Sequence, residues 1–288
     1  MSTAHLHFLK GHGTENDFVI VPDPAGLINL SPAAVARLCD RRAGIGADGL
    51  LRVVRSEAHP EGRRMAADAE WFMDYRNADG SIAEMCGNGV RVFARYLQHA
   101  GLAETGDLAV GTRAGVRRVH LAKDGDVTVG MGRAVLPAGP DAEVTVTVGE
   151  RSWPARNVGM GNPHAVAFVA DLADAGRLYE APGVAPAAVY PQGVNVEFVV
   201  DRGPRQVAMR VHERGSGETR SCGTGACAVA VATARRDGVD PAVTGRPETY
   251  TVDVPGGRLV VTEHPDGEVE MTGPALIVAE GDTTADWL

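Results

Sequence analysis

Two of the four cysteines stand at the start of matching Cys-Gly-x-Gly turns. Cys86 opens CGNG and Cys222 opens CGTG, 136 positions later, and each turn leads into an apolar run typical of a helix. A cysteine at a helix N-terminus lies at the positive end of the helix dipole, which lowers the pKa of its thiol. The glycines let free backbone N–H groups approach a carboxylate closely. Each turn therefore predicts one activated thiol beside part of a carboxylate site.

Two such turns facing each other would place thiols on opposite sides of one α-carbon. One thiolate could remove the α-proton while the other thiol returns a proton from the opposite face, which inverts the stereocentre. Backbone N–H groups would stabilise the negative charge that spreads onto the carboxylate. A buried cysteine is otherwise most often a small hydrophobic residue, the role we expect for Cys39 and Cys227. A structural disulfide between Cys86 and Cys222 is the alternative.

The cysteine turns belong to an internal repeat. MDYRNADGSIAEMCGNGVRVFARYL, from Met73, aligns without a gap with MRVHERGSGETRSCGTGACAVAVAT, from Met209. A second pair, HGTENDFVIVPD and GMGNPHAVAFVAD, brings Asn16 near Asn162. A third pair, RAGVRRVHLAKDGDVTVGMG and PGGRLVVTEHPDGEVEMTG, ends the two halves. Three pairs in the same order predict a duplicated domain.

The predicted fold is mixed α/β, with two pseudo-symmetric halves that each wrap a strongly curved sheet around a buried central helix. We expect the N-terminal half at residues 1–132, completed by 274–288, and the C-terminal half at 133–273. The final strand of a duplicated unit often completes the other sheet, which is the reason for the exchange of the last residues. The active site is expected in the cleft between the halves.

Helices are expected at residues 32–42, with Ser31 as N-cap, and at 89–99 and 225–236. The last two lack a broad polar face, which indicates that each is buried. The third repeat pair alternates apolar and polar residues around an Asp-Gly dipeptide, which predicts one hairpin at the end of each half.

Composition excludes several classes of function. The formal net charge is -9 and no basic stripe is present, so nucleic acid and anionic membranes are poor partners. No apolar run reaches the ~18 residues of a membrane span, and the first residues lack a signal-peptide pattern, so the cytoplasm is expected. No Cys or His stands at zinc spacing, and Lys10 and Lys123 are the only lysines. Lys123 lies in a predicted turn, so a pyridoxal-phosphate Schiff base and a metal are both disfavoured.

The sequence resembles the diaminopimelate epimerase family over nearly its whole length. The resemblance rests on HGTENDFV, RRAGIGADGL, RNADGSIAEMCGNGVRVFARYL, GMGNPHAV, GVNVEFV, ERGSGETRSCGTGACA and DVPGG. It implies the two-half fold of that family, no cofactor and no metal. It also implies interconversion of LL- and meso-diaminopimelate, in lysine and peptidoglycan precursor synthesis, by an enzyme that is often a homodimer.

The resemblance also implies roles for particular residues. Cys86 and Cys222 match the acid/base thiols, and His164 and Glu213 match their polar partners, with the pairing left open. The residues that match the lining of the reacting carboxylate are Gly87, Asn88, Gly223 and Thr224. The residues that match the substrate-recognition set, to which Glu213 is added, are Asn16, Asn77, Asn162, Asn195 and Arg214.

The chemistry of these residues suits a substrate with an amino acid at each end. Arg214 can form a two-pronged contact with the distal carboxylate, and Asn side chains can donate to a carboxylate or accept from an ammonium. Any single one of these asparagines could instead be only a turn residue. Two departures from the family pattern appear. Glu15 stands in GTEND where glycine is usual, and Gly49 stands in GIGADG where some members carry Gln.

Three rival functions remain. A proline or hydroxyproline racemase would share the fold and the thiol pair, but its first motif usually reads CGHG. An isomerase of the phenazine-biosynthesis type would lack the paired cysteines. A thiol redox sensor or binding protein would explain the cysteines without the carboxylate site.

Overall fold

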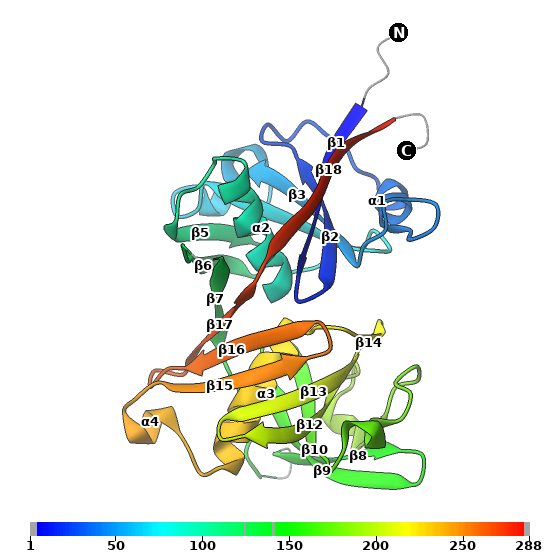
Figure 1. Ribbon diagram of the computed structural model, residues 1–288, viewed down its shortest axis with the longest axis vertical. Helices are drawn as coiled ribbons and strands as arrows, with labels where there is room; N and C mark the ends of the chain where they lie inside the picture. Colours follow the sequence, from blue (N-terminus) through cyan, green and yellow to red (C-terminus); the bar gives the residue numbers. More distant parts are fainter. Residues whose placement is uncertain (1–4, 124, 140–141, 285–288) are drawn as a thin grey trace. The chain divides into compact units, whose positions relative to one another are not determined.

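The computed structural model describes residues 5–123, 125–139 and 142–284. It divides the chain into two compact units (Figure 1). We call residues up to Val129, together with those from Gly273 onward, the N unit, and Gly130–Thr272 the C unit. Both units combine a mixed sheet with few helices, so the expected mixed α/β fold is confirmed.

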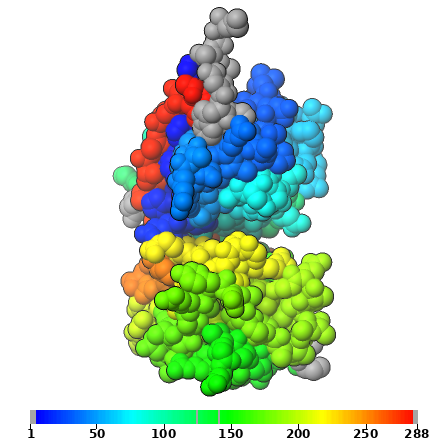
Figure 2. Space-filling model, turned by 90° about the vertical axis from the view of Figure 1, so that its right-hand side faces the viewer, coloured from blue at the N-terminus to red at the C-terminus, as the bar shows by residue number. Residues whose placement is uncertain are grey.

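The N unit builds its sheet in the order β18-β1-β2-β3-β4-β5-β6-β7. The bounds are β1 His5–Gly13, β2 Asn16–Pro22, β3 Gly49–Arg55, β4 Trp71–Asn77, β5 Gly106–Thr112, β6 Gly115–Leu121, β7 Asp126–Arg133 and β18 Leu276–Thr284. The pairs β2–β3 and β4–β5 are parallel, and the others are antiparallel. The red β18 lies beside the blue β1 in both views (Figures 1 and 2).

The C unit repeats this succession as β8-β9-β10-β12-β13-β15-β16-β17. The bounds are β8 Glu143–Val148, β9 Arg151–Gly159, β10 Pro163–Phe168, β11 Gly183–Ala185, β12 Asn195–Gly203, β13 Gln206–Glu213, β14 Gly217–Thr219, β15 Glu248–Val254, β16 Gly257–Glu263 and β17 Glu268–Pro274. Here β10–β12 and β13–β15 are the parallel pairs. Each strand of the N unit thus has a counterpart in the C unit with the same neighbours and directions, as a duplication requires, and β11 and β14 are additional strands of the C unit.

One long helix packs against the strands of each unit. These helices are α2 Gly87–His99 in the N unit and α3 Gly223–Arg236 in the C unit, and most of their residues are buried. Both begin two residues earlier than expected, and the cysteine before each helix is its N-cap. The hairpins β6–β7 and β16–β17 form as predicted, although Asp124 in the first turn lies outside the described residues.

Helix α1, Pro32–Cys39, ends three residues before the predicted end. Ser31 caps it as expected, accepting a hydrogen bond from the backbone N–H of Ala34. At the other end, the Asp40 carboxylate accepts from the N–H groups of Arg42 and Ala43. This turn competes with continuation of the helix, which a sequence period alone does not register. The remaining helical segments are α4 Pro241–Thr244, η1 Ser56–Ala58, η2 Arg63–Met65, η4 Leu172–Ala175 and η5 Ala187–Val189.

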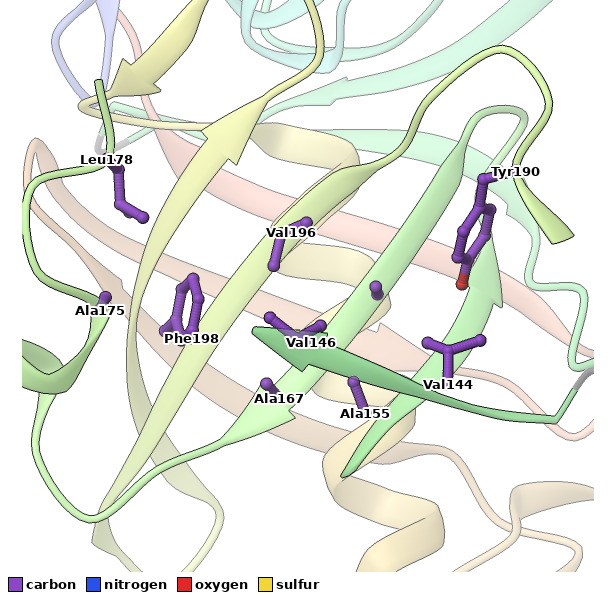
Figure 3. Packing of buried hydrophobic residues seen from close by; sticks show 10 residues of the cluster. Val144, Val146, Ala155, Ala167, Ala175, Leu178, Tyr190, Val196 and Phe198 are labelled. Atoms are coloured by element: carbon purple, nitrogen blue, oxygen red, sulfur yellow. The ribbon is translucent and has the colours of Figure 1, made fainter. Parts of the chain in front are cut away.

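The C-unit sheet is covered on both faces. Val196 and Phe198 of β12 point into an apolar cluster with Val144, Val146 and further residues (Figure 3). Alternate residues of a strand point to opposite faces. The polar residues Asn195 and Glu197 therefore face the other way, toward α3. The same alternation in β10 puts Ala165 and Ala167 in the cluster and His164 on the α3 side.

Candidate active site

Cys86 is the N-cap of α2 in the N unit. Its backbone is extended, and its sulfur accepts a hydrogen bond from the N–H of Gly89, with Sγ and N 3.4 Å apart. Most helices place a hydroxyl, amide or carboxylate oxygen at this position. Here a sulfur takes the role, so it lies at the positive end of the helix with one free N–H of the first turn pointing at it, an arrangement that favours negative charge there.

Two of the predicted asparagines lie beside Cys86. Asn88 Nδ2 donates to Asn16 Oδ1 at 3.2 Å, and the Cys86 sulfur lies 3.7 Å from the same oxygen. Asn16 Nδ2 in turn donates to Asp48 at 2.8 Å. Arg91, which is completely buried, donates to Asn88 Oδ1 at 3.0 Å and fixes the orientation of that amide. Reasoning from the sequence did not single out Arg91.

Asn77 takes part in a different arrangement. It ends β4, and its Nδ2 donates to Ser81 Oγ at 3.0 Å within its own turn. Its partner across the strands is Gly49. A Cβ at Gly49 would lie 2.7 Å from the carbonyl oxygen of Arg76 and 2.8 Å from the Tyr75 ring. This strand pair therefore leaves no room for a side chain at Gly49 unless its neighbours shift.

Glu15 occupies a strained turn between β1 and β2. Thr14 and Glu15 have φ angles of 51° and 62°, in the left-handed region that favours glycine. A non-glycine residue there costs about 1–2 kcal/mol. The hydroxyl of Thr14 accepts from buried Arg91 at 3.1 Å. The Glu15 departure is therefore accommodated in the turn, and Arg91 links that turn to α2.

Cys222 is the corresponding N-cap of α3 in the C unit. Its Sγ accepts from the N–H of Gly225 at 3.3 Å and lies 3.5 Å from Thr224 Oγ1. Burial raises the pKa of Cys222 well above its usual value, and the carboxylates of Glu213 and Glu197 add to this. The helix-dipole expectation of a lowered thiol pKa is thus wrong for Cys222 here. Loss of hydration outweighs the hydrogen bonds from Thr224 and Gly225.

A chain of hydrogen bonds continues from Cys222 into the C unit. Asn162 Nδ2 lies 3.3 Å from Thr224 Oγ1, and Asn162 Oδ1 lies 2.9 Å from His164 Nε2. His164 Nδ1 is 2.6 Å from Glu197 Oε1, and neither side chain has any exposed surface. The structure thus brings together four predicted residues, and adds Glu197.

Glu197 was missed by sequence reasoning, although a signal existed. It stands in the strand sequence NVEFVV, two residues after Asn195, so strand alternation puts it on the same face as that predicted residue. A carboxylate inside an otherwise apolar run is rare unless it has a partner. That partner, His164, comes from the neighbouring parallel strand and is invisible in a local window of sequence.

Asn195 and Arg214 hold each other. Asn195 Oδ1 accepts from the backbone N–H of Arg214 at 2.9 Å, and its Nδ2 donates to the carbonyl of Pro163 at 3.1 Å. The Arg214 guanidinium donates to the carbonyl of Gln192 at 3.1 Å and borders a cavity of about 240 Å³ within the C unit. Asn195 thus uses its amide to position the backbone that carries Arg214.

Glu213 lies at the end of β13 and accepts a hydrogen bond from the Thr219 hydroxyl across the β13–β14 pair. Its charge raises the pKa of Cys222. Gly223 and Thr224 form the first turn of α3, as Gly87 and Asn88 form that of α2. Most of the predicted residues therefore lie around one or other capped cysteine, whereas Asn77 lies in its own turn and Asn195 and Arg214 form a separate hydrogen-bonded pair.

The described residues contain no group of three or more His, Cys, Asp and Glu side chains that could hold a metal. The Lys10 ammonium pairs with Asp17 at 2.7 Å and donates to the carbonyl of Gly46. Within the same residues, no helix is long and apolar enough to cross a membrane.

Solved structures share the fold at low sequence identity. A probable proline racemase from Agrobacterium radiobacter, with bound carbonate, matches with a TM-score of 0.69 and 15% identity over 98% of this chain and 93% of its own. A phenazine biosynthesis protein from Bacillus anthracis matches with a TM-score of 0.67 and 16% identity over 97% and 99%. Fold and site together define a duplicated α/β protein with a cysteine-capped helix in each unit.

Sequence comparison identifies the family. The diaminopimelate epimerase family model matches residues 8–137 and 156–278. The diaminopimelate epimerase of Streptomyces coelicolor is 78% identical over the whole of this chain and 98% of its own length. The chain therefore belongs to the diaminopimelate epimerase family and is an isomerase.

Proposed function

We propose that this protein interconverts LL- and meso-diaminopimelate, and so serves the synthesis of lysine and peptidoglycan precursors. The observation that carries the proposal is the pair of cysteine N-caps, Cys86 and Cys222, at equivalent places in two units with the same strand succession. The 78% sequence identity with the diaminopimelate epimerase of Streptomyces coelicolor supports the choice of substrate.

The chemistry requires only proton transfers. One sulfur, as thiolate, takes the α-proton, and the electron pair of the broken C–H bond spreads onto the α-carboxylate. The other sulfur, as thiol, gives its proton to the opposite face of the same carbon. The two sulfurs exchange protonation states, so charge balances and the reverse reaction starts from the product state.

The substrate carboxylate has donors at each helix start. The N–H groups of Gly87 and Asn88 in α2, and of Gly223 and Thr224 in α3, belong to first turns that have no intrahelical acceptor for them. Such groups stabilise charge that develops on a carboxylate in the transition state. Arg214, at the border of the C-unit cavity, is proposed to hold the distal carboxylate.

The proposed enzyme works in the cytoplasm as a homodimer, without metal or organic cofactor. Size-exclusion chromatography with light scattering tests the dimer. Activity after exhaustive dialysis against chelator and treatment with a carbonyl scavenger tests the absence of metal and of pyridoxal phosphate. Loss of activity that added metal or pyridoxal phosphate restores would overturn that part of the proposal.

The decisive experiment is incubation of the purified protein with LL-diaminopimelate in heavy water, without additives. We expect the meso isomer, with one deuterium at the inverted α-carbon. Proline serves as the comparison substrate, because a proline racemase is the alternative function. Turnover of proline alone, with diaminopimelate untouched, would replace the proposal with that alternative.

A further inference from the structure

Glu197 and His164 form a buried pair behind Cys222 that the proposed reaction does not itself require. Glu197 Oε1 lies 2.6 Å from His164 Nδ1, and both side chains are fully buried. The second carboxylate oxygen, Oε2, has no hydrogen-bond partner among the residues that the structure describes. Burying a carboxylate with half its acceptor capacity unused is costly. Stability alone therefore gives no reason for this pair.

The N unit shows what the fold does without such a pair. Parallel strands β2 and β3 correspond to β10 and β12, so Phe18 occupies the place of His164 and Leu51 that of Glu197. A Cβ at Gly89 would lie 3.6 Å from the Phe18 ring and 3.4 Å from Leu51. The first turn of α2 thus rests on an apolar pair.

The C unit puts an acid at the corresponding point. A Cβ at Gly225 would lie 2.8 Å from Glu197 Oε1, and the N–H of Gly225 donates to the Cys222 sulfur. The same architecture therefore carries a hydrocarbon behind one thiol and a carboxylate behind the other. The difference is local chemistry and not topology.

The hydrogen-bond chain from Glu197 to Cys222 can run in either of two donor-to-acceptor directions, which we call its polarities. In one, the Thr224 hydroxyl donates to a Cys222 thiolate, and Asn162 Nδ2 donates to Thr224. Asn162 Oδ1 then needs a donor, so His164 carries a proton on Nε2. If Glu197 is ionised, Nδ1 carries a proton as well, because the carboxylate 2.6 Å away can only accept. In the other, the Cys222 thiol donates to the Thr224 hydroxyl. The Asn162 side-chain amide is rotated so that its oxygen and nitrogen exchange places, and its NH₂ group donates to Nε2 of a neutral His164.

In the second polarity the neutral ring donates from Nδ1 to Glu197, whereas in the first, with Glu197 ionised, His164 is an imidazolium. An imidazolium without exposed surface requires a countercharge, and the carboxylate at 2.6 Å supplies one. We propose that Glu197 is a positioning residue: through His164 it sets the hydrogen-bond polarity that supports a thiolate at Cys222. This inference rests on the proposed function only for the use of that thiolate in catalysis.

Other charged and titratable groups face the same place. Glu213 at the end of β13 and Glu197 itself both oppose ionisation of Cys222 through space. Tyr190 lies on the other side, with its hydroxyl 3.5 Å from the carbonyl of His164. Beside an imidazolium, the Glu197 charge is neutralised at close range. The proposal requires that the support Glu197 gives through the hydrogen-bond chain exceed its direct repulsion of the sulfur, and the direction of the pKa shift in Glu197→Gln decides this.

The test measures the pH dependence of alkylation at each cysteine, by mass spectrometry of protein treated with iodoacetamide. Glu197→Gln keeps the shape of the side chain and removes its charge. We expect the Cys222 profile to move to higher pH, with about tenfold less thiolate at a given pH, or ~1 pKa unit. The Cys86 profile in the same sample should not move, because its helix start rests on Phe18 and Leu51.

Controls separate this role from a structural one. Glu263→Gln removes another buried carboxylate of the C unit, one paired with Arg235, and should leave the Cys222 profile in place. Glu197→Asp retains the charge and should recover part of the shift. A Cys222 profile that moves to lower pH in Glu197→Gln, or does not move, would overturn the inference, whether or not the protein epimerises diaminopimelate.

A second measurement needs no change at Glu197. Nitrogen-15 NMR of the unmodified protein, with the His164 signals assigned from a His164→Gln variant, reports the protons on both ring nitrogens. We expect doubly protonated His164 wherever Cys222 is ionised. A neutral ring beside an ionised Cys222 contradicts the proposed polarity.

Discussion

The third residue of each Cys-Gly-x-Gly turn offers a matched pair of substitutions. Gly89 and Gly225 occupy the same position of α2 and α3, and neither has a positive φ. Alanine at either site brings the same gain in intrinsic helix stability, about 1 kcal/mol at most. The difference in unfolding free energy between the two variants therefore reports the packing of the added methyl group against its neighbours.

The surroundings of the two methyl groups differ. At Gly89 the nearest atoms, on Cys86 and Leu51, would be 3.4 Å away, which is ordinary contact. At Gly225 the methyl group would lie 2.8 Å from Glu197 Oε1 and 3.1 Å from the Cys222 sulfur. Glu197 cannot swing away freely, because His164 holds it at 2.6 Å.

Overpacking of this kind costs about 1–3 kcal/mol. We therefore expect Gly89→Ala to be neutral or stabilised by up to about 1 kcal/mol, and Gly225→Ala to be less stable than it by about 1–3 kcal/mol. Urea unfolding followed by circular dichroism measures the two midpoints. If Gly225→Ala unfolds at the same midpoint as Gly89→Ala or above it, the close packing of Glu197 under α3 is wrong.

Three further expectations follow from the site. Cys222→Ala should exchange the α-hydrogen of one stereoisomer with deuterium without inverting it, and Cys86→Ala that of the other. The epimerisation rate of both variants should fall by roughly 10²–10⁴-fold or more. NMR of α-deuteration with chiral analysis of the product measures both effects, and a near-normal rate of inversion in either variant would contradict the mechanism. Arg214→Lys keeps the charge but loses the planar fork, so kcat/KM should fall by about tenfold or more; an unchanged value means that Arg214 does not hold the distal carboxylate. Because burial raises the pKa of Cys222 above that of an unfolded thiol, this group stabilises the fold below about pH 8.5 and loses that contribution as pH rises further. Cys222→Ser should flatten the alkaline fall in unfolding free energy, and an unaltered pH profile would count against a buried resting thiol.

The sequence carries most of the local information about the site. Repeated Cys-Gly-x-Gly turns predict helix starts because glycine and a capping side chain are local requirements. Buried helices follow from apolar residues on nearly every side, as in the run after Gly225. The hairpins follow from strand alternation around Asp-Gly turns. These features depend on neighbours within a few positions, which a sequence pattern records directly.

Features that depend on distant neighbours were not predictable in this way. The pairing of Glu197 with His164 needs the parallel register of β10 and β12. The raised pKa of Cys222 could not be predicted without knowing how deeply the thiol is buried. Burial raises this pKa, whereas the helix dipole, which the sequence does reveal, lowers it. The buried ion Arg91 joins α2 to Thr14 across 77 positions of chain. Each is a balance between a local preference and a tertiary contact.

The contrast between the two units bears on how an enzyme with duplicated thiols starts each turnover. Inversion needs one sulfur ionised and the other protonated, and two identical surroundings would give neither sulfur a preference. Phe18 and Leu51 offer the Cys86 turn no group that changes its charge, whereas His164 and Glu197 give Cys222 two hydrogen-bond polarities. Cys222 can be a thiol or a thiolate if reversing one chain of hydrogen bonds stabilises each state. It can then be protonated when Cys86 is ionised and ionised when Cys86 is protonated, as the two directions of the reaction require. Replacing Glu197 should then slow the two directions unequally at a pH where only one state of Cys222 is populated. The equilibrium constant between the isomers is a property of the substrates and does not change in a variant. Any change in the ratio of the two kcat values must therefore be matched by an equal change in the ratio of the two KM values.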